Sequence, residues 1–490
     1  MVVSETGGLM TGHDESYDFG MGHAVFQSLI QTFVGALSRW APSFALCIFA
    51  LASGIAFWAH LIGMDRQASL PTAKLLRRLL GFGLMLRVVF ALCTPTFYAP
   101  DERLHYCYLL HLDQFRSFPV KGLGQPLPEG FPPPHLIPNE PYDGEFTQPP
   151  LYYLLLLPLH RFAALFDVSD PLAVRYLRLC NVILWLTGAI LVLRALRRLN
   201  LSEEFIGVFV MAMVCLLPSY VFLTSMINND NLLFALGCLI IFLAASEQCL
   251  RHSVLMGIAL GCSLLTKMHG LSYLLIPVTV AAVDSLRRRG SLRILVVNLF
   301  IAILLTITIC APWAIRNVMV YSDLTGVMIT QPVTRWTSAV GSADTVRRNI
   351  TQTFWSASGL TNNVRFLPVL GAHLWYLSLL GWGWRLLRRP KSSLDRLEGD
   401  RISLWIGIGA SIAANLVMAV VYGFLYGQPQ GRYLFPSLFG IGLFTAMGLD
   451  FLGVRQRIQE SRAHVVGFFA TYAFCFTVYS LILFPHMMRS

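Results

Sequence analysis

The chain has 490 residues, of which 55% are hydrophobic and 13% are charged, and its formal net charge at pH 7 is +11. Soluble domains carry about a quarter of charged residues, so this composition excludes an ordinary soluble fold. The basic excess does not indicate a nucleic-acid partner, because most Arg and Lys residues lie in short loops beside apolar segments. The sequence therefore predicts a multi-pass protein that is surrounded by membrane lipid.

Apolar runs of roughly 17 to 23 residues, which is the length that crosses a bilayer as a helix, recur along the chain. Residues 253–284 suit a hairpin of two short helices that is broken at Lys267–Gly270. The other runs are 44–63, 79–97, 177–193, 205–224, 231–247, 293–311, 366–384, 402–424, 433–452 and 464–484. Because an unpaired backbone cannot lie in lipid, we expect an all-α fold with about 12 spans.

The domain organisation follows from these runs. Residues 1–43 form a polar N-terminal segment, and residues 44–490 form one transmembrane domain. Basic loops alternate with non-basic loops, and the basic ones are expected in the cytoplasm. The alternation holds only if the apolar stretch 151–166 does not cross the membrane, so we expect a helix there that lies at the outer interface or is re-entrant. This leaves two long outer loops, 98–175 and 317–365, and loops of this length are usually functional or disordered.

Adjacent carboxylates follow the second predicted span, in the string YAPDERLHY. If a helix starts after Pro100, Asp101 and His105 share one face, four residues apart. Carboxylates at a membrane surface can take a proton from a hydroxyl group or hold a metal ion. A simpler alternative is that Asp101 and Glu102 form only the acidic first turn of a helix, where the helix dipole favours them.

Three cations are predicted on the same outer face. Lys267 lies in LLTKMHG, Arg316 in APWAIRN and Arg432 in QGRYLFP. A single such residue is most simply a snorkelling anchor at a helix end. Three of them against the positive-inside bias favour a substrate site, and phosphate is the ligand that suits them.

Two further polar features need partners. Asn228, Asn229 and Asp230 precede an apolar run, where they can hydrogen-bond a sugar or, more simply, cap the helix. Arg87 lies inside a predicted span, where an unpaired charge costs about 2.5 to 3.5 kcal/mol on insertion scales. We therefore expect a buried carboxylate or carbonyl group beside Arg87.

Six strings, in this order, are PDERLH, QPPLYYLLLLP, SMINNDNLL, LLTKMHG, APWAIRN and QGRYLFP, spread from Pro100 to Pro436. Together they resemble the GT-C class of polytopic glycosyltransferases, which includes protein O-mannosyltransferases and lipid A aminoarabinose transferase. The early PDE-x-x-H and the late QGRYLFP resemble a less-studied bacterial branch of that class. One feature departs from the usual pattern, since an extra span precedes Pro100.

The resemblance implies an inverting transfer of a sugar from a polyprenyl-phosphate donor, at the extracytoplasmic face of the inner membrane. By analogy Asp101 is the general base, Glu102 assists it or positions the substrate, and His105 is a candidate substrate-binding residue. Binding of the donor phosphate by Lys267, Arg316 and Arg432 is our own assignment. The sugar stays open, as does the acceptor, which is a glycan, a lipid or a protein. Some members use a divalent metal and others do not, so the cofactor is also open.

Two other classes of function remain. A lipid or solute transporter, or a flippase, predicts inverted repeats and ionisable residues near the middle of the membrane. No repeat stands out, and apart from Arg87 the notable charges cluster at the outer ends of the spans. A non-catalytic membrane assembly protein predicts that Asp101 tolerates substitution.

Overall fold

The computed structural model describes most of the chain between residues 72 and 452. The described residues are 72–122, 128–129, 143–165, 170–202, 205–246, 249–287, 292–326, 343–356, 366–388, 395–426, 429–452, 467 and 469. All of them belong to one unit, Ala50–Ser490. The predicted segment 1–43, the span 44–63 and nearly all of the span 464–484 lie outside the described residues. Within the described part the elements are helical and no strand occurs, which confirms the predicted all-α fold.

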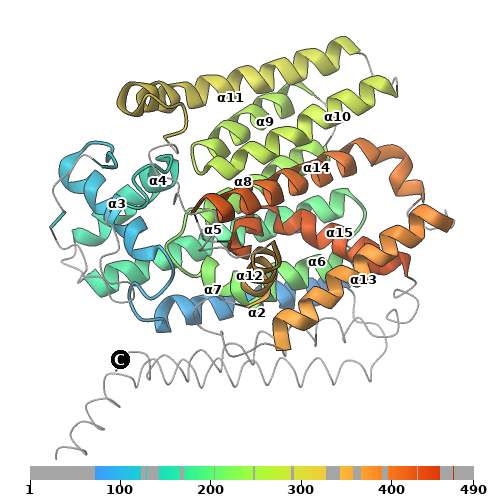
Figure 1. The fold of residues 1–490 in the computed structure, drawn as a ribbon, viewed down its shortest axis with the longest axis horizontal. Helices are drawn as coiled ribbons and strands as arrows, with labels where there is room; N and C mark the ends of the chain where they lie inside the picture. The colour runs from blue at the N-terminus through green and yellow to red at the C-terminus, as the bar shows by residue number, and fades with distance from the viewer. Residues whose placement is uncertain are drawn as a thin grey trace, which may run out of the picture. The chain divides into compact units, whose positions relative to one another are not determined.

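Figure 1 shows the helices, and their bounds follow in chain order. They are α2 (Thr72–Cys93), α3 (Glu102–Phe115), α4 (Leu151–Ala164), α5 (Asp170–Arg198), α6 (Phe205–Leu216), α7 (Pro218–Thr224), α8 (Asp230–Ala244), α9 (Leu250–Leu264), η1 (Met268–Leu274), α10 (Leu275–Leu286), α11 (Leu292–Tyr321), α12 (Ala343–Trp355), α13 (Phe366–Arg388), α14 (Asp395–Tyr426), η2 (Gly431–Ser437) and α15 (Leu438–Phe451). The 3-10 helices η1 and η2 each run directly into an α-helix.

Five stretches in the described part are long and apolar enough to cross a membrane, or six if α6 and α7, which bend by 53°, form one broken span. The five are Pro171–Arg198, Met268–Leu286, Leu292–Tyr321, Arg401–Phe424 and Gly431–Phe451. All six overlap predicted runs. In contrast, α8 and α9 have 15 residues each, fewer than the roughly 20 that cross a bilayer as a single helix. The hairpin at 253–284 does break near the predicted place, since α9 ends at Leu264 and the 3-10 helix η1 begins at Met268.

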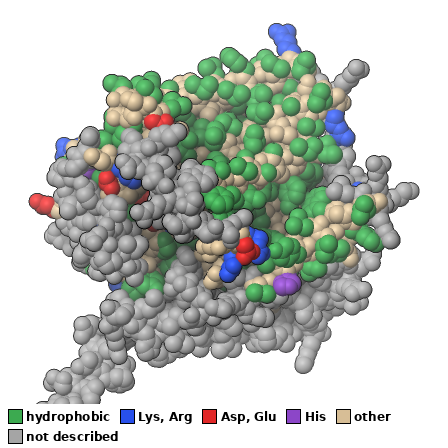
Figure 2. Space-filling model, in the orientation of Figure 1, with side chains coloured by type: hydrophobic (Ala, Val, Ile, Leu, Met, Phe, Trp, Pro, Cys, Tyr) green, Lys and Arg blue, Asp and Glu red, His purple; other side chains and the backbone are tan. Residues whose placement is uncertain are grey.

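The surface over α9, α10 and α11 is largely hydrophobic in Figure 2. Helix α11 is the most exposed of the five long stretches, since only 22% of its most apolar 18-residue part is buried. Its exposed residues include Phe300, Leu304 and Ile307. A helix that keeps apolar side chains outward in this way is suited to lipid rather than to water.

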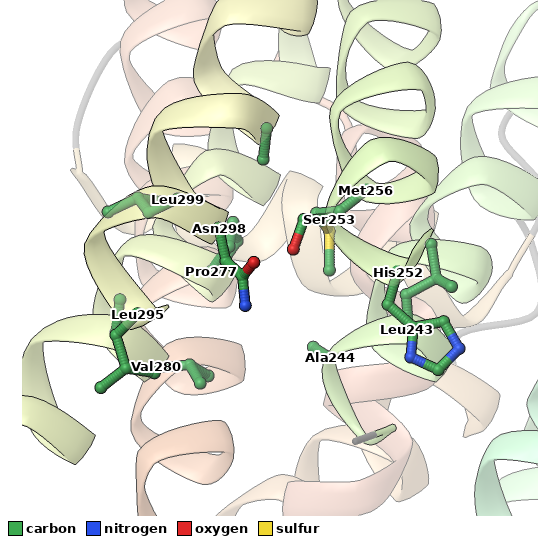
Figure 3. Close-up of a pocket in the computed structure, with 12 residues that line it drawn as sticks. Leu243, Ala244, His252, Ser253, Met256, Pro277, Val280, Leu295, Asn298 and Leu299 are labelled. Carbon is green, nitrogen blue, oxygen red and sulfur yellow. The ribbon is translucent and has the colours of Figure 1, made fainter. Parts of the chain in front are cut away.

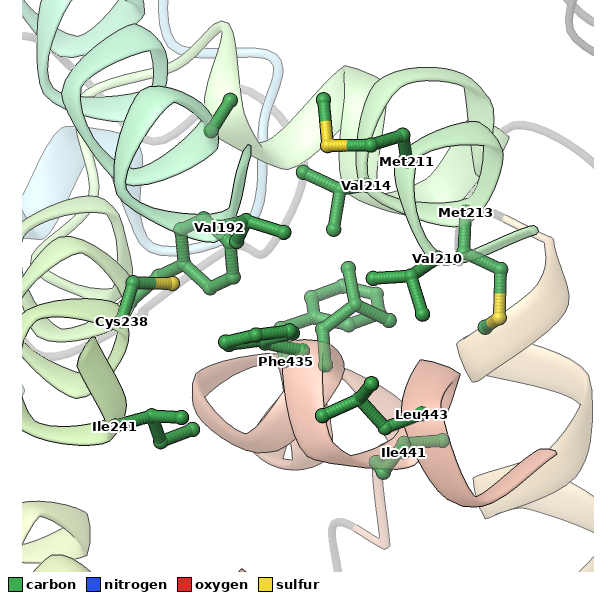
Figure 4. Packing of buried hydrophobic residues seen from close by; sticks show 14 of the residues in the cluster. Val192, Val210, Met211, Met213, Val214, Cys238, Ile241, Phe435, Ile441 and Leu443 are labelled. Carbon is green, nitrogen blue, oxygen red and sulfur yellow. The ribbon is translucent and has the colours of Figure 1, made fainter. Parts of the chain in front are cut away.

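The interior of the bundle is built around α6 and the segment η2–α15. Figure 4 shows Val210 and Val214 of α6 opposite Phe435 and Leu443, with Ile241 of α8 beside them. Small residues bring helices close together elsewhere. A Cβ on Gly381 of α13 would lie 1.7 Å from the carbonyl oxygen of Gly448 in α15. Close contact through small residues is typical of helices packed in a membrane.

Helices α3 and α4 form a second hydrophobic core with the start of α5. The rings of Tyr108 and Tyr153 stack there with centroids 3.7 Å apart. Helix α4 has 14 residues, so it is about 21 Å long and shorter than the roughly 30 Å hydrocarbon layer. This length agrees with the prediction that residues 151–166 do not cross the membrane. Asp113 of α3 joins the two helices, since its carboxylate contacts both His160 and Arg161.

The two polar features that needed partners have them. Arg87 is fully buried and donates to the carbonyl oxygens of Gly83, Val214 and Cys215 and to the Thr224 hydroxyl. The predicted carbonyl partners of Arg87 are therefore confirmed.

At the start of α8 the N-cap residue, Asn229, makes no capping hydrogen bond with its side chain, and the residue before it supplies one instead. The side-chain oxygen of Asn228 accepts a 2.8 Å bond from the backbone N–H of Asp230. This leaves the carboxylate of Asp230 free for another partner.

Candidate active site

A strained turn presents Asp101 at the start of α3. Both Phe97 and Asp101 have φ of 61°, in the left-handed region. That region is unfavourable for a bulky residue such as Phe, and Asp tolerates it better. Asp101 is the N-cap residue of α3, yet its side chain makes no capping hydrogen bond. Because the usual role of an N-cap carboxylate is not used, the side chain is available for other contacts.

The carboxylate of Asp101 meets Arg432, which lies 331 positions away in the chain. Arg432 donates from Nη2 to Oδ2 of Asp101 at 2.5 Å. The arginine side chain is 6% exposed and the aspartate side chain is 28% exposed, so the pair lies at the edge of the packed interior. Burial alone would raise the pKa of Asp101, but Arg432, His105 and Lys267 outweigh it and hold that pKa below its ordinary value.

Gly431 explains how Arg432 is positioned. A Cβ on Gly431 would lie 2.2 Å from the carbonyl oxygen of Ile350 and 2.4 Å from the backbone nitrogen of Phe354. The backbone N–H of Gly431 also donates to the hydroxyl of Thr353 at 2.6 Å. Glycine therefore lets the backbone of η2 approach α12, and this contact holds the arginine in place.

A second ion pair lies in the same cluster. Lys267, at the break between α9 and η1, donates from Nζ to Oδ1 of Asp230 at 2.7 Å. Both side chains are largely buried, and the ammonium group lies 5.9 Å from the ring centroid of Tyr433. In the sequence Asp230 was considered as part of a segment that binds a sugar or caps a helix, and its contact with Lys267 depends on how α8 and α9 pack.

His105 lies one turn into α3 and is buried. Its Nδ1 lies 2.8 Å from the hydroxyl oxygen of Tyr153. Burial lowers the pKa of His105 to about 4, with further lowering from Lys267 and Arg432 and an opposing effect from Asp101. The imidazole is therefore neutral at pH 7 and suited to hydrogen bonding rather than to binding charge.

A third carboxylate, which sequence reasoning missed, belongs to the cluster. Glu145 lies in the turn that precedes α4, and the charges that act on it are those of Asp101, Lys267, Arg432 and Asp230. The one signal in the sequence is its position three residues before the string QPPLYYLLLLP. Without the fold nothing distinguishes Glu145 from the other acidic residues of the first outer loop.

Glu102 has a different environment from the one expected for a group that assists catalysis. Its side chain is 0% exposed, and its two oxygens accept bonds of 2.7 and 2.6 Å from Arg178. The same carboxylate accepts a 3.2 Å bond from the backbone N–H of Ile227. A carboxylate enclosed in this way is not open to a substrate in this structure.

Arg316 is not brought into the cluster. It donates to the carbonyl oxygen of Pro119 at 2.5 Å and to the side-chain oxygen of Asn317. Its guanidinium lies over the rings of Trp313 and Tyr321, at 4.6 and 5.0 Å from their centroids. Sequence reasoning grouped Arg316 with Lys267 and Arg432 because all three were predicted at outer helix ends, but the contacts of Arg316 hold α11 to the loop after α3.

An apolar cavity of about 730 Å³ lies between α12, α13, α14 and α15. Among its lining residues are Ile350, whose carbonyl oxygen faces Gly431, and Leu434, two residues after Arg432. Arg347 and Tyr376, which are hydrogen-bonded to each other, also line it. The cavity is therefore adjacent to the segment that carries Arg432.

A smaller cavity of about 30 Å³ lies between α8, α9, α10 and α11. Asn298 and Ser253 face each other across it in Figure 3. Ser253 is near the start of α9, whereas Lys267 follows its end, so the cavity is about 20 Å from the ionic cluster. Its volume suits one or two water molecules rather than a substrate.

No group of three or more His, Cys, Asp or Glu side chains is arranged to hold a metal ion in the described part of the chain. The carboxylates of Asp101 and Asp230 are each paired with a cation, so they do not form a ready set of metal ligands. The sequence left the use of a divalent metal open, and these contacts do not test it.

The helices and the ionic cluster define a polytopic helical membrane fold with a polar site at one end of α3, α8 and α9. No protein-family model matches the sequence, and no curated protein matches it. Solved structures with a similar fold include ArnT from Cupriavidus metallidurans bound to undecaprenyl phosphate, at a TM-score of 0.50 and 14% identity, covering 84% of this chain and 77% of that chain. The same protein in the apo state matches at a TM-score of 0.44 and 16% identity, covering 85% and 77%. The first match establishes a polytopic membrane fold like that of ArnT.

Proposed function

We propose that this chain is a membrane glycosyltransferase that moves a sugar from a polyprenyl-phosphate donor to an acceptor at the extracytoplasmic face of the inner membrane. The observation that carries the proposal is the cluster of Asp101, Arg432, Lys267 and Asp230, which joins buried cations to carboxylates beside an apolar cavity. The acceptor is a glycan, a lipid or a protein.

Two cations suit a lipid phosphate. Nε of Arg432 is buried and makes no hydrogen bond within the described structure, although Nη2 of the same group is bound to Asp101. A guanidinium with a free N–H can donate to a phosphate oxygen, and such charge-assisted bonds are strong. Lys267 supplies a second positive charge in the same cluster.

The apolar cavity beside η2 suits part of an isoprenoid tail. Its volume of about 730 Å³ is within the range of ligand sites, and its lining is almost entirely hydrophobic. A donor with its tail there and its phosphate at Arg432 presents its sugar to Asp101. ArnT has a similar fold, and its solved structure contains undecaprenyl phosphate, which supports a donor lipid of this class here.

The proposed chemistry is an inverting displacement. Asp101 draws the proton from the acceptor hydroxyl, whose oxygen attacks the anomeric carbon as the bond from that carbon to the phosphate oxygen breaks. Positioned cations stabilise the charge on the departing phosphate, and a positioned base typically contributes about 10² to 10⁴-fold in rate. In this proposal His105, whose Nδ1 lies 2.8 Å from the hydroxyl oxygen of Tyr153, remains the candidate substrate-binding residue beside Asp101.

The test is transfer by purified full-length protein in nanodiscs from a panel of undecaprenyl-phosphate sugars. We expect one donor to release undecaprenyl phosphate in the presence of a suitable acceptor, and the same assay with a chelator measures metal dependence. Single-cysteine labelling at Gly144, in a cysteine-free background, tests whether the site faces outward. Movement of intact lipid across the membrane without transfer would favour a flippase, and the absence of both would favour an assembly protein.

A further inference from the structure

Glu145 differs from the other two carboxylates of the cluster in its contacts. Asp101 and Asp230 are each paired with a cation. Glu145 is half-buried, and within the described residues its carboxylate makes neither a hydrogen bond nor an ion pair. A carboxylate that is drawn into a charged cluster but left unpaired is available to exchange a proton.

The turn that carries Glu145 is held firmly against the site. Its backbone carbonyl accepts a 2.9 Å bond from the N–H of Gln148, whose own carbonyl oxygen accepts from the hydroxyl of Tyr108. The side chain of Asn229 donates to the side-chain oxygen of Gln148 at 3.3 Å. The N–H of Leu151 donates to the carbonyl oxygen of Leu265, two residues before Lys267. Helices α3 and α9 and the start of α8 therefore set the position of the turn.

Charged and titratable groups of several neighbouring elements act electrostatically on Glu145. They are Asp101 at the start of α3, Asp230 at the start of α8, Lys267 between α9 and η1, Arg432 and Tyr433 of η2, Tyr153 of α4 and Tyr422 of α14. The two cations are already compensated by Asp101 and Asp230, so a third negative charge is poorly balanced in this cluster.

We propose that Glu145 is a further catalytic residue, and that the proton which Asp101 draws from the acceptor hydroxyl comes to rest on its carboxylate. The inference rests on the proposed glycosyl transfer. The acceptor O–H bond breaks, its oxygen bonds to the anomeric carbon, and the bond from that carbon to the phosphate oxygen breaks with its electron pair on the phosphate. The proton moves to Asp101 and then to Glu145, so charge and atoms balance.

The ionisation of the two carboxylates supports this order. Burial and the neighbouring charge of Asp101 raise the pKa of Glu145 to about 7, whereas the pKa of Asp101 is held below its ordinary value. Proton transfer from protonated Asp101 to ionised Glu145 is downhill. As the pH falls below about 7, Glu145 is already protonated and cannot accept another proton, so the rate falls.

The experiment measures the transfer rate across neutral pH with the undecaprenyl-phosphate sugar that the wild type uses. We expect the wild-type rate to fall on the acid side with an apparent pKa near 7. The kcat of Glu145→Gln should be about 10²-fold lower than that of the wild type, and its rate should no longer fall on the acid side. This variant should still bind undecaprenyl phosphate. Glu145→Asp should recover part of the rate together with its pH dependence.

The matched control is Asp143→Asn, which removes a carboxylate from the same turn. Asp143 accepts a bond from the N–H of Gly122, and asparagine keeps an acceptor oxygen for it. This control should keep the wild-type rate and pH profile. If the wild type is active, and Glu145→Gln keeps both the wild-type rate and its fall on the acid side, the inference is wrong and the proposed function stands. A wild type that transfers no sugar from any donor would overturn the proposed function and the inference with it.

Discussion

Asp101 and Glu102 are adjacent in the chain and each is paired with an arginine, yet the two ion pairs have different surroundings. The pair of Glu102 with Arg178 is 0% exposed on both sides, whereas Asp101 is 28% exposed in its pair with Arg432. Because Asp101 has left-handed backbone and α3 begins one residue later, the two carboxylates point into different environments. Neighbouring residues of one chemical type can therefore have separate roles.

The enclosed pair connects the segments that carry the site. Arg178 also donates to the carbonyl oxygens of Ala91, Thr94 and Pro95, just before the turn of Asp101. Glu102 accepts from the N–H of Ile227, three residues before Asp230. The buried pair of Glu102 and Arg178 thus holds both the turn of Asp101 and the segment before Asp230. The pair of Asp101 and Arg432 is more exposed, so a ligand can reach it.

The largest effect is expected from breaking the enclosed pair. Arg178→Met leaves the carboxylate of Glu102 buried without its partner, and such a loss costs about 3 to 5 kcal/mol of stability. The free energy of unfolding in detergent, from a denaturant titration, measures this cost. The double variant Glu102→Gln with Arg178→Met should recover part of the stability, because no buried charge then remains. Wild-type stability in Arg178→Met would show that the pair does not hold the turn.

Breaking the open pair should instead affect the reaction. Asp101→Asn keeps the shape of the side chain and removes the base, so transfer should fall by about 10²-fold or more. Donor binding and the unfolding transition should stay close to those of the wild type. Asp143→Asn is the control for a lost carboxylate in the same outer loop. Near-normal transfer by Asp101→Asn would reject Asp101 as the base.

The smallest effects concern the cations and are best measured as binding of undecaprenyl phosphate in nanodiscs. A charge-assisted bond to phosphate contributes roughly 1.5 to 3 kcal/mol, so Lys267→Gln and Arg432→Gln should each weaken binding by about 10-fold or more. Arg432→Lys should also bind less tightly, since it loses the planar donor geometry.

Arg316→Gln is the matched control, because this arginine contacts Pro119 and two aromatic rings instead of the cluster. It should change binding little. Equal weakening by Arg316→Gln and Arg432→Gln would mean that the phosphate site extends to α11. Unchanged binding across the whole series would reject the phosphate assignment.

Part of the site could be predicted from the sequence. Asp101, His105, Lys267 and Arg432 were assigned to one face from the alternation of loops, and they do meet in one cluster. The same reasoning included Arg316, because the side of the membrane on which a residue lies gives its position along the membrane normal and not its lateral position. It omitted Glu145, since the lateral packing that brings this turn beside α8 and η2 leaves no mark in the local sequence.

By itself the sequence determined that the protein lies in a membrane, that it is helical, and where most of its long helices occur. Those properties depend on apolar content and run length, which are local, and on the need of every backbone group in lipid for a hydrogen bond. Only the tertiary structure decided which carboxylate is enclosed, which is paired at the surface of the site and which is left unpaired. The partner of Asp101 is 331 residues away, and the change from left-handed backbone at Asp101 to helical backbone at Glu102 separates the environments of the two carboxylates.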